Sequence, residues 1–345
     1  MFSKYYPLLF EPNLHTVIWG GDTITKWKGL HANEKPIGES WEVSAVPSSV
    51  NIISNGEYRG KDLVAFIDSN PEEILGSHVA RQYHNQLPLL VKFIDARRDL
   101  SIQVHPNDEM AQRLHHKRGK SEMWYVLDAA PGAFLYAGFA KSLVSNGNGD
   151  VSTNRETVID AYRRRVADGT IVDTLAKHEV KAGDVFYLPA GRVHAICGGI
   201  LLAEIQQSSD VTYRIFDYNR LGIDGKPREL HTELAAEALD FRVEDDYRTQ
   251  YSYEPGHPNV LVDNTFFTVR ITEMTSPYHF NLLEEDSFVI VMCLKGDCRI
   301  VVHGATEAVQ LKEGYSAFIP ATVANYEIIP DNKDCFTKVL DAYVG

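Results

Sequence analysis

The sequence predicts a mainly β protein made of two β-barrels, the first of which carries a small helical insertion. Short strand-like segments bounded by turn residues recur along the chain, a pattern typical of β-sandwiches and barrels. A diverged repeat is also present, and 345 residues are enough for two domains. We expect a first domain over residues 1–245, with its helical insertion at about 144–178, and a second domain over 256–345. The acidic, tyrosine-rich stretch 240–259 is the expected linker.

The strand prediction depends on short runs rich in apolar, β-branched and aromatic residues. Turn residues bound most of these runs, as they do in antiparallel β proteins. In chain order we expect strands within 40–46, 87–96, 100–105, 122–128, 184–190, 194–206, 267–274, 287–296, 298–304 and 316–321.

Two segments read as helices instead. Residues 107–119 carry apolar side chains four residues apart on an otherwise polar helix, whose two histidines, His115 and His116, we expect at the surface. Residues 152–178 begin with a candidate capping box of Thr153 and Glu156, followed by apolar residues at helical spacing.

The repeat joins "GDVFYLPAGRVH" (183–194) to "GYSAFIPATVAN" (314–325). Both contain Gly, five residues, Pro, one residue, a small residue, two residues and a polar residue. Each copy follows a matching strand upstream. Many more residues separate this strand from the motif glycine in the first copy than in the second, and the helices predicted at 152–178 account for the difference. This difference favours two barrels, of which one carries an insertion.

Composition and charge narrow the classes of function. Hydrophobic residues make up 44% of the chain and charged residues 23%, as in ordinary globular proteins. A formal charge of −13 argues against non-specific nucleic-acid binding, which requires a basic surface. No apolar run approaches a membrane span or a signal peptide, so we expect no membrane partner. The cysteines form no CxxC and suggest a reduced, cytoplasmic protein: Cys197, Cys293, Cys298 and Cys335.

The stretch "SIQVHPND" places two polar residues in a strand that should be buried. Gln103 and His105 alternate with Ile102 and Val104, so both polar side chains share one face. A buried polar pair is costly unless hydrogen bonds or a metal ion satisfy it.

The repeat skeleton resembles the second motif of the cupin barrel. Gly183, Pro189, Gly191 and His194 match it, while Gly198 stands where the family often has Asn. The first cupin motif usually has two histidines followed by Glu.

Here the first motif reads Gln103-x-His105, with Glu122 following after sixteen residues. Two histidines, a carboxylate and an amide oxygen suit zinc or another divalent transition ion. In the second copy Asn325 stands in place of the histidine and Val289 in place of the glutamate, so we expect no metal there.

Two cations could supply the positive charge that an anionic substrate needs in this acidic chain. Lys120 precedes Glu122 by two residues, so in a strand both side chains point into one cavity. Arg214 lies among apolar strand residues, and a buried arginine rarely lacks an anionic partner.

Several longer stretches resemble the short bacterial form of the type I mannose-6-phosphate isomerase family. They are "IWGG", "GESWEVS", "QVHPND", "GKSEMWYVL" and "LPAGRVHAICGGILLAEIQQSSDVTYRIFDYNR". The resemblance implies a zinc enzyme with two cupin barrels that interconverts mannose 6-phosphate and fructose 6-phosphate. It implies zinc ligands at His105, Glu122 and His194, with Gln103 as a fourth. It also implies an active-site arginine at Arg214 and a substrate-binding lysine at Lys120. Long members of the family carry a larger helical domain, which is reduced here.

The chemistry of such an isomerisation fits these residue types. A proton moves between C1 and C2 through an enediol, and a divalent metal stabilises the negative charge on the sugar oxygens. A general base is also required. Asp210, His194 when it is not a ligand, and a hydroxide on the metal are three alternatives that the sequence leaves open.

Three other functions remain as alternatives. Two histidines and a glutamate also form the ligand triad of non-haem iron oxygenases, so a cupin dioxygenase is one. A sugar-binding regulatory cupin is another, although the chain lacks a helix-turn-helix segment and a basic face. A metal-free structural or storage bicupin is disfavoured by the complete ligand set of the first barrel.

Overall fold

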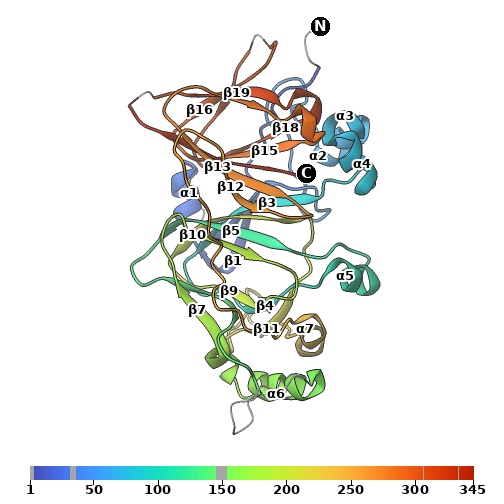
Figure 1. Cartoon of the computed structure of the whole chain (residues 1–345), viewed down its shortest axis with the longest axis vertical. Helices are drawn as coiled ribbons and strands as arrows, with labels where there is room; N and C mark the ends of the chain where they lie inside the picture. The colour runs from blue at the N-terminus through green and yellow to red at the C-terminus, as the bar shows by residue number, and fades with distance from the viewer. Residues whose placement is uncertain (1–3, 32–35, 145–153, 306, 333) are drawn as a thin grey trace.

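The computed structural model describes residues 4–31, 36–144, 154–305, 307–332 and 334–345. The chain is mainly β, as predicted, and it forms two units that stack along the long axis of the molecule. Figure 1 shows the orange and red strands of the C-terminal unit above the green and cyan strands of the N-terminal one. Each unit is a pair of facing antiparallel sheets rather than a closed barrel, which is the jelly-roll form of the cupin fold.

The N-terminal unit contains a six-stranded and a five-stranded sheet. Their orders are β1-β2-β3-β10-β5-β8 and β11-β4-β9-β6-β7. The strands are β1 Leu14–Gly21, β2 Ile37–Val43, β3 Leu89–Ala96, β4 Ile102–Val104, β5 Glu122–Ala129, β6 Phe134–Phe139, β7 Leu175–Glu179, β8 Val185–Leu188, β9 His194–Ile196, β10 Ile200–Gln207 and β11 Tyr213–Phe216.

The C-terminal unit repeats this plan with fewer strands. Its sheets have the orders β12-β13-β20-β15-β18 and β14-β19-β16-β17. These orders match β2-β3-β10-β5-β8 and β4-β9-β6-β7 strand for strand, so the repeat seen in the sequence is structural. The strands are β12 Asn259–Asp263, β13 Thr268–Met274, β14 Tyr278–Asn281, β15 Val289–Lys295, β16 Cys298–Val302, β17 Val309–Leu311, β18 Ser316–Ile319, β19 Asn325–Pro330 and β20 Thr337–Tyr343.

Both helices predicted from the sequence are present, but neither matches the prediction at every residue. The first is α5 Asp108–His115, capped by the side chain of Asn107. The second is α6 Arg155–Ala167, which the side chain of Asn154 caps; Thr153 lies outside the described residues. The insertion continues as the 3-10 helix η1 Thr170–Thr174 and ends there, because residues 175–179 form strand β7 and not helix.

The sequence reading missed five short helices: α1 Thr23–Trp27, α2 Leu63–Ser69, α3 Pro71–Leu75, α4 Ser77–Gln82 and α7 Thr232–Ala238. Each is too short for a sustained apolar period to show. Helices α2 to α4 lie beside the C-terminal strands in Figure 1. The carboxylate of Asp286 accepts hydrogen bonds from the N–H groups of Ser77 and His78 at 3.0 Å, so a residue of one unit caps a helix of the other. Such distant caps leave no local sequence signal.

The two units share one hydrophobic core. The outward face of the six-stranded sheet presents Leu89, Val91 and Phe93, and these belong to the same buried cluster as Val289 and Val291 of the C-terminal unit. The tyrosine-rich stretch expected as a linker has little regular structure but is tied down. Its Tyr247 and Tyr251 hydroxyls donate to backbone carbonyls of the first unit at 2.9 Å. None of the described helices is long and apolar enough to cross a membrane.

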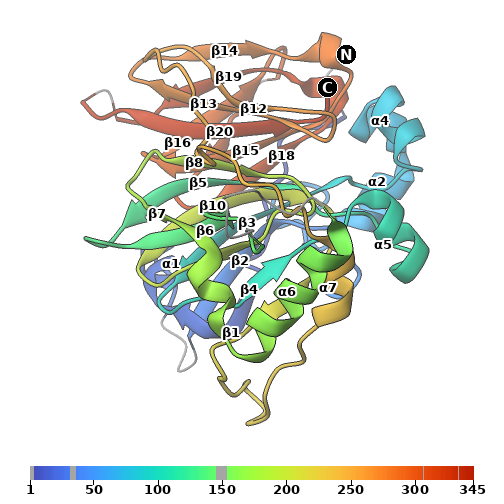
Figure 2. The same cartoon turned by 60° about the horizontal axis from the view of Figure 1, so that its bottom comes forward.

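The two short 3-10 helices η2 Leu283–Glu285 and η3 Ala321–Val323 complete the C-terminal unit. Figure 2 brings α6 and α7 to the front, beside the strands of the N-terminal unit. These two helices cover a second buried cluster, which includes Tyr162, Val104 and Tyr213, on the outer face of the five-stranded sheet. The opposite face of that sheet lines the interior of the unit, where the candidate site lies.

Candidate metal centre

Three residues that the sequence singled out converge inside the N-terminal unit. His105 follows β4, Glu122 begins β5 and His194 begins β9, and all three are buried. One ligand atom from each lies within 4.8 Å of the others. The Nε2 atoms of His105 and His194 lie 3.4 and 3.3 Å from the two oxygens of Glu122. Facing sheets therefore bring together ligands that are far apart in sequence.

The turn before His194 places this histidine. Gly191 has φ +90°, a left-handed conformation that glycine adopts without strain. Its backbone N–H donates to the carbonyl of His105 at 2.9 Å, which joins the two ligand-bearing loops. This is the physical role of the glycine in the motif recognised from sequence.

Backbone carbonyls orient both imidazoles. His105 Nδ1 lies 3.0 Å from the Val211 carbonyl, and His194 Nδ1 lies 2.8 Å from the Arg192 carbonyl. A carbonyl only accepts, so each Nδ1 carries the proton and each Nε2 presents a lone pair toward Glu122. Metal-ligating histidines are commonly held in this way.

The protonation states also suit a cation. Burial, together with Lys120, lowers the pKa of His105 to about 3, and burial lowers that of His194. Burial alone would raise the pKa of Glu122, but Lys120 and the two histidines hold it well below its usual value. The site therefore presents two neutral imidazoles and one carboxylate at neutral pH, as a divalent metal requires.

The hydrogen bonding of the Glu122 carboxylate indicates whether a metal ion fits this site. Both of its oxygens are buried and neither accepts a hydrogen bond, among the residues that the structure describes. An ion pair with Lys120, 2.9 Å from Nζ to Oε2, compensates only part of the cost of burying it. A cation between the two imidazoles and this carboxylate would satisfy the remaining oxygen, so the donor set fits a metal ion.

Gln103 lies beside the same group. It pairs with His194 across β4 and β9, and its amide Nε2 lies 3.3 Å from His194 Nε2. A half-turn of the amide exchanges its nitrogen and oxygen, which would place the oxygen toward the histidine side. Gln103 is therefore placed to act as a fourth ligand.

The two predicted cations lie at different distances from these ligands. Lys120 is buried, and its Nζ lies 3.2 Å from His105 Nε2 as well as against Glu122. Arg214 pairs in register with Gln103 across β4 and β11. Its guanidinium donates to the Glu229 carbonyl at 3.0 Å, while its Nε is buried without a hydrogen-bond partner in the described part of the chain. Lys120 thus belongs to the cluster itself and Arg214 lies one strand away.

A second ionic group inside the unit was missed from the sequence. Lys92 on β3 lies 3.2 Å from Glu204 on β10 and 3.8 Å from Glu39 on β2. Trp124 donates to Glu204 at 3.0 Å. A lysine within the apolar run "LPLLVKFIDA" and a glutamate within "ILLAEIQ" were the available signals, because a charge in an otherwise buried strand requires a partner. These residues extend the polar interior beyond the ligands.

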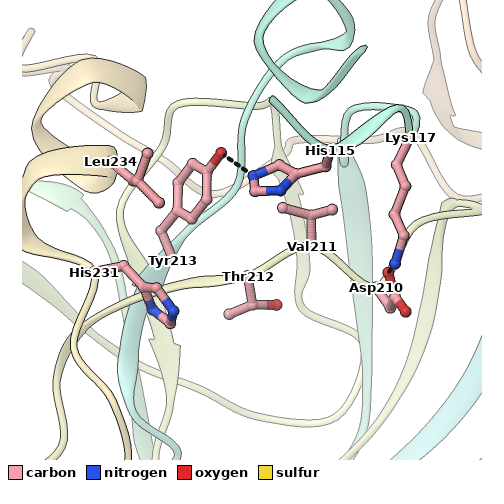
Figure 3. Close-up of a pocket in the computed structure, with 8 residues that line it drawn as sticks. All are labelled: His115, Lys117, Asp210, Val211, Thr212, Tyr213, His231 and Leu234. Carbon is pink, nitrogen blue, oxygen red and sulfur yellow. Dashed lines mark hydrogen bonds and ion pairs between the residues drawn. The ribbon is translucent and has the colours of Figure 1, made fainter. Parts of the chain in front are cut away.

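A cavity of about 340 Å³ lies at the start of β11, and its lining includes Val211, whose carbonyl lies 3.0 Å from His105 Nδ1. Figure 3 shows its lining residues, with His115 turned toward the hydroxyl of Tyr213 and Lys117 toward Asp210. His115 Nε2 lies 2.8 Å from that hydroxyl, so this histidine, expected at the surface, is half-buried, while His116 is exposed. Asp210 forms an exposed 2.5 Å ion pair with Lys117 and does not contact the three ligands directly.

The fold and the site define a class of protein: a bicupin whose first unit carries a metal-capable His-Glu-His group. Comparison with known proteins agrees. A family model described as "Phosphomannose isomerase type I, catalytic domain" matches residues 8–128, and one described as "Mannose-6-phosphate isomerase, cupin domain" matches 259–330.

Relatives of known name match over nearly the whole chain. A mannose-6-phosphate isomerase of Streptococcus mutans is 32% identical over 94% of this chain and 96% of its own length. A probable mannose-6-phosphate isomerase of Bacillus subtilis is 33% identical over 87% of this chain and 89% of its own. The crystal structure of a Bacillus subtilis mannose 6-phosphate isomerase superposes with a TM-score of 0.82 at 26% identity, over 98% of this chain and 99% of the other. The chain belongs to the type I mannose-6-phosphate isomerase family of enzymes.

Proposed function

We propose that this protein is a zinc-dependent aldose–ketose isomerase that interconverts mannose 6-phosphate and fructose 6-phosphate through an enediol. The family membership supports the reaction, and one structural observation supports the metal. The carboxylate of Glu122 is buried between two imidazoles that present their Nε2 lone pairs to it, and it accepts no hydrogen bond from the residues whose structure is described. His105, Glu122 and His194 would hold the ion, with Gln103 as fourth ligand. Two nitrogens and one or two oxygens suit zinc.

The bound ion would act as a Lewis acid that stabilises negative charge on the sugar oxygens. Lys120, which lies against Glu122 and His105, would then donate to the same reacting end of the sugar. The residue type alone does not separate this role from phosphate binding, but the buried position of the lysine favours it. Arg214, one strand away, would contact the sugar oxygens from the Gln103 side.

We also propose a division of labour between the two units. Residues 1–245 would carry the chemistry, and residues 256–345 would form a metal-free cover. The supporting observation is that strands β14, β15 and β19 offer Asn281, Val289 and Asn325 where the first unit has Gln103, Glu122 and His194.

One assay tests the proposed function. The purified protein, stripped of metal by a chelator and reloaded with zinc, is mixed with mannose 6-phosphate, and fructose 6-phosphate is measured. We expect turnover in the absence of oxygen that is lost on chelation and restored by zinc. Oxygen consumption with an iron-loaded protein, and no isomerisation with any metal, would instead indicate the dioxygenase alternative.

A further inference from the structure

A second cavity lies away from the three candidate ligands, where the loops after β3 and β11 meet the turn between β9 and β10. Its volume is about 410 Å³. Three of its six lining residues are arginines, although the protein as a whole carries −13. The lining residues are Arg97, Arg98, Asp99, Gly198, Tyr218 and Arg220.

Two of these arginines are adjacent in the chain. Arg97 and Arg98 follow β3 directly and are exposed, and neither guanidinium forms a hydrogen bond or ion pair with any residue described in the structure. Their backbone N–H groups both donate to the carbonyl of Trp19, at 3.0 and 3.1 Å, so the chain that carries them is fixed. Two adjacent unpaired cations on an anchored segment can both reach one anion.

The third arginine, Arg220, is held in place by its surroundings. It is paired with Asp217 at 2.7 Å and donates to the backbone carbonyl of Asp99. Arg228 pairs with the same Asp217, so two guanidinium groups share one carboxylate and positive charge remains in excess. Asp99 itself is turned toward the protein, since its carboxylate accepts from the Gly198 N–H at 2.8 Å.

The loop that bears Arg220 is strained. Tyr218 and Asn219 both have positive φ, +55° and +54°, a region that costs energy for residues other than glycine. The guanidinium of Arg220 lies over the Tyr218 ring, 5.0 Å from its centre. Strained backbone of this kind is common where a loop positions a ligand-binding group.

We propose that this pocket binds a phosphate group. A phosphate dianion offers several oxygens to several guanidinium groups at once, and Arg binds such oxyanions with two parallel hydrogen bonds. Asp99 is the one acidic residue among those that line the pocket, and its carboxylate accepts from the Gly198 N–H, so Arg97 and Arg98 leave the pocket with a net positive charge. Because the protein as a whole is acidic, it can hold an anion only where positive charge is locally in excess, as it is in this pocket.

The phosphate can come from two sources. Asp99 lies four residues before Gln103 along the chain, at most about 13 Å at ~3.3 Å per residue, which an extended sugar phosphate and an arginine side chain can span together. The pocket would then hold the phosphate of the proposed substrate, and this reading depends on the proposed function. Leu100, which follows Asp99, and Ile196, two residues after His194, are both buried, and the Leu100 N–H donates to the Ile196 carbonyl at 2.8 Å. This closed apolar contact favours instead a separate phosphate.

Calorimetric titration with inorganic phosphate tests the site in the zinc-loaded protein. The double variant Arg97→Gln/Arg98→Gln removes two exposed cations without touching a buried group. The matched control, Arg59→Gln/Arg81→Gln, removes the same charge from exposed arginines outside the pocket. We expect the pocket variant to bind phosphate at least about tenfold more weakly and the control to match the native protein. Equal binding by all three proteins overturns the proposal.

Kinetics with mannose 6-phosphate then distinguish the two sources. A KM raised about tenfold in the pocket variant alone, with kcat unchanged, indicates the substrate's own phosphate. An unchanged KM together with weaker phosphate binding indicates a separate site. Absence of turnover by the native protein would contradict the proposed function and leave the binding result to stand on its own.

Discussion

Val289 occupies, in the C-terminal unit, the strand position that Glu122 occupies in the N-terminal one. Glu122 pairs with Leu188 across β5 and β8, and Val289 pairs with Ile319 across β15 and β18. In both units a proline follows the partner residue. The same positions of the two units therefore carry a candidate metal ligand in one case and a core side chain in the other.

This correspondence leads to the first prediction: one zinc ion per chain, in the N-terminal unit. Elemental analysis of the native protein should give one ion, and His194→Ala should lose most of it because the three-residue group is broken. His279→Ala, which removes an exposed histidine of the C-terminal unit, is the matched control and should keep the ion. Two ions per chain, or full occupancy in His194→Ala, would refute the assignment.

A second prediction concerns Arg214, which lies opposite Gln103 on the neighbouring strand. If it contacts charge that develops in the transition state, Arg214→Ala should lower kcat by roughly 10²–10³ with little change in KM. Arg214→Lys should recover only part of the loss, since the charge returns but the planar fork does not. Zinc content is measured in both variants. A rise in KM alone would show that the arginine binds substrate and transition state equally.

Lys120 gives a third prediction. Its ammonium group lies against Glu122 and His105, so we expect Lys120→Met to lower kcat and not only to raise KM. A lysine that merely held the phosphate would act through KM, because that contact is equally strong in both states. Zinc affinity must be measured in the same variant, because Glu122 loses its cationic neighbour. A change confined to KM would indicate that Lys120 binds the phosphate and does not act at the reacting end of the sugar.

The candidate site could be predicted from sequence because its ligands follow short motifs. The period of two in "SIQVHPND" and the glycine and proline before His194 are local signals, and the structure brings their side chains together. The match between Asn325 and His194 was equally readable, because the repeat preserves its spacing. The resemblance to a known family added the roles of these residues in binding a metal ion and a substrate.

What the sequence did not predict depends on distant partners. Helix α4 is only six residues long and is capped by Asp286 from the other unit, so no local pattern marks its start. The half-buried position of His115 arises from Tyr213, which lies far along the chain. The Lys92–Glu204 pair joins two strands that become neighbours only in the folded sheet. Such contacts are fixed by tertiary packing and not by spacing.

That buried pair gives a fourth prediction, about stability. Replacing Lys92 by Met would leave Glu204 buried without its cation, and we expect the free energy of unfolding to fall by about 3–5 kcal/mol. The double variant Lys92→Met/Glu204→Gln removes both charges and keeps an acceptor for Trp124, so it should be less destabilised than the single variant. Urea denaturation of the native protein and both variants checks the order. A double variant less stable than the single one would show that the pair is net stabilising by itself.

The last prediction concerns the contact between the two units. Leu89, Val91 and Phe93 are fully buried, and the C-terminal unit covers them. Polar contacts also join the two units: Trp27 donates to Glu313 at 2.7 Å and Tyr315 donates to the Lys28 carbonyl at 3.1 Å. A chain ending at residue 250 would expose each of these apolar side chains, at a cost of about 1.5–3 kcal/mol apiece.

We therefore expect such a truncated chain to be insoluble or inactive when it is expressed alone, because so large an apolar face favours aggregation. Coexpression with a second chain of residues 251–345 should restore solubility and isomerase activity, since the two fragments can rebuild the shared core. A C-terminal fragment that also carries Asn325→Ala separates a covering role from a catalytic one. Activity should remain with this fragment, because we expect Asn325 not to bind a metal. A soluble, fully active chain of residues 1–250 would show that the cover is dispensable.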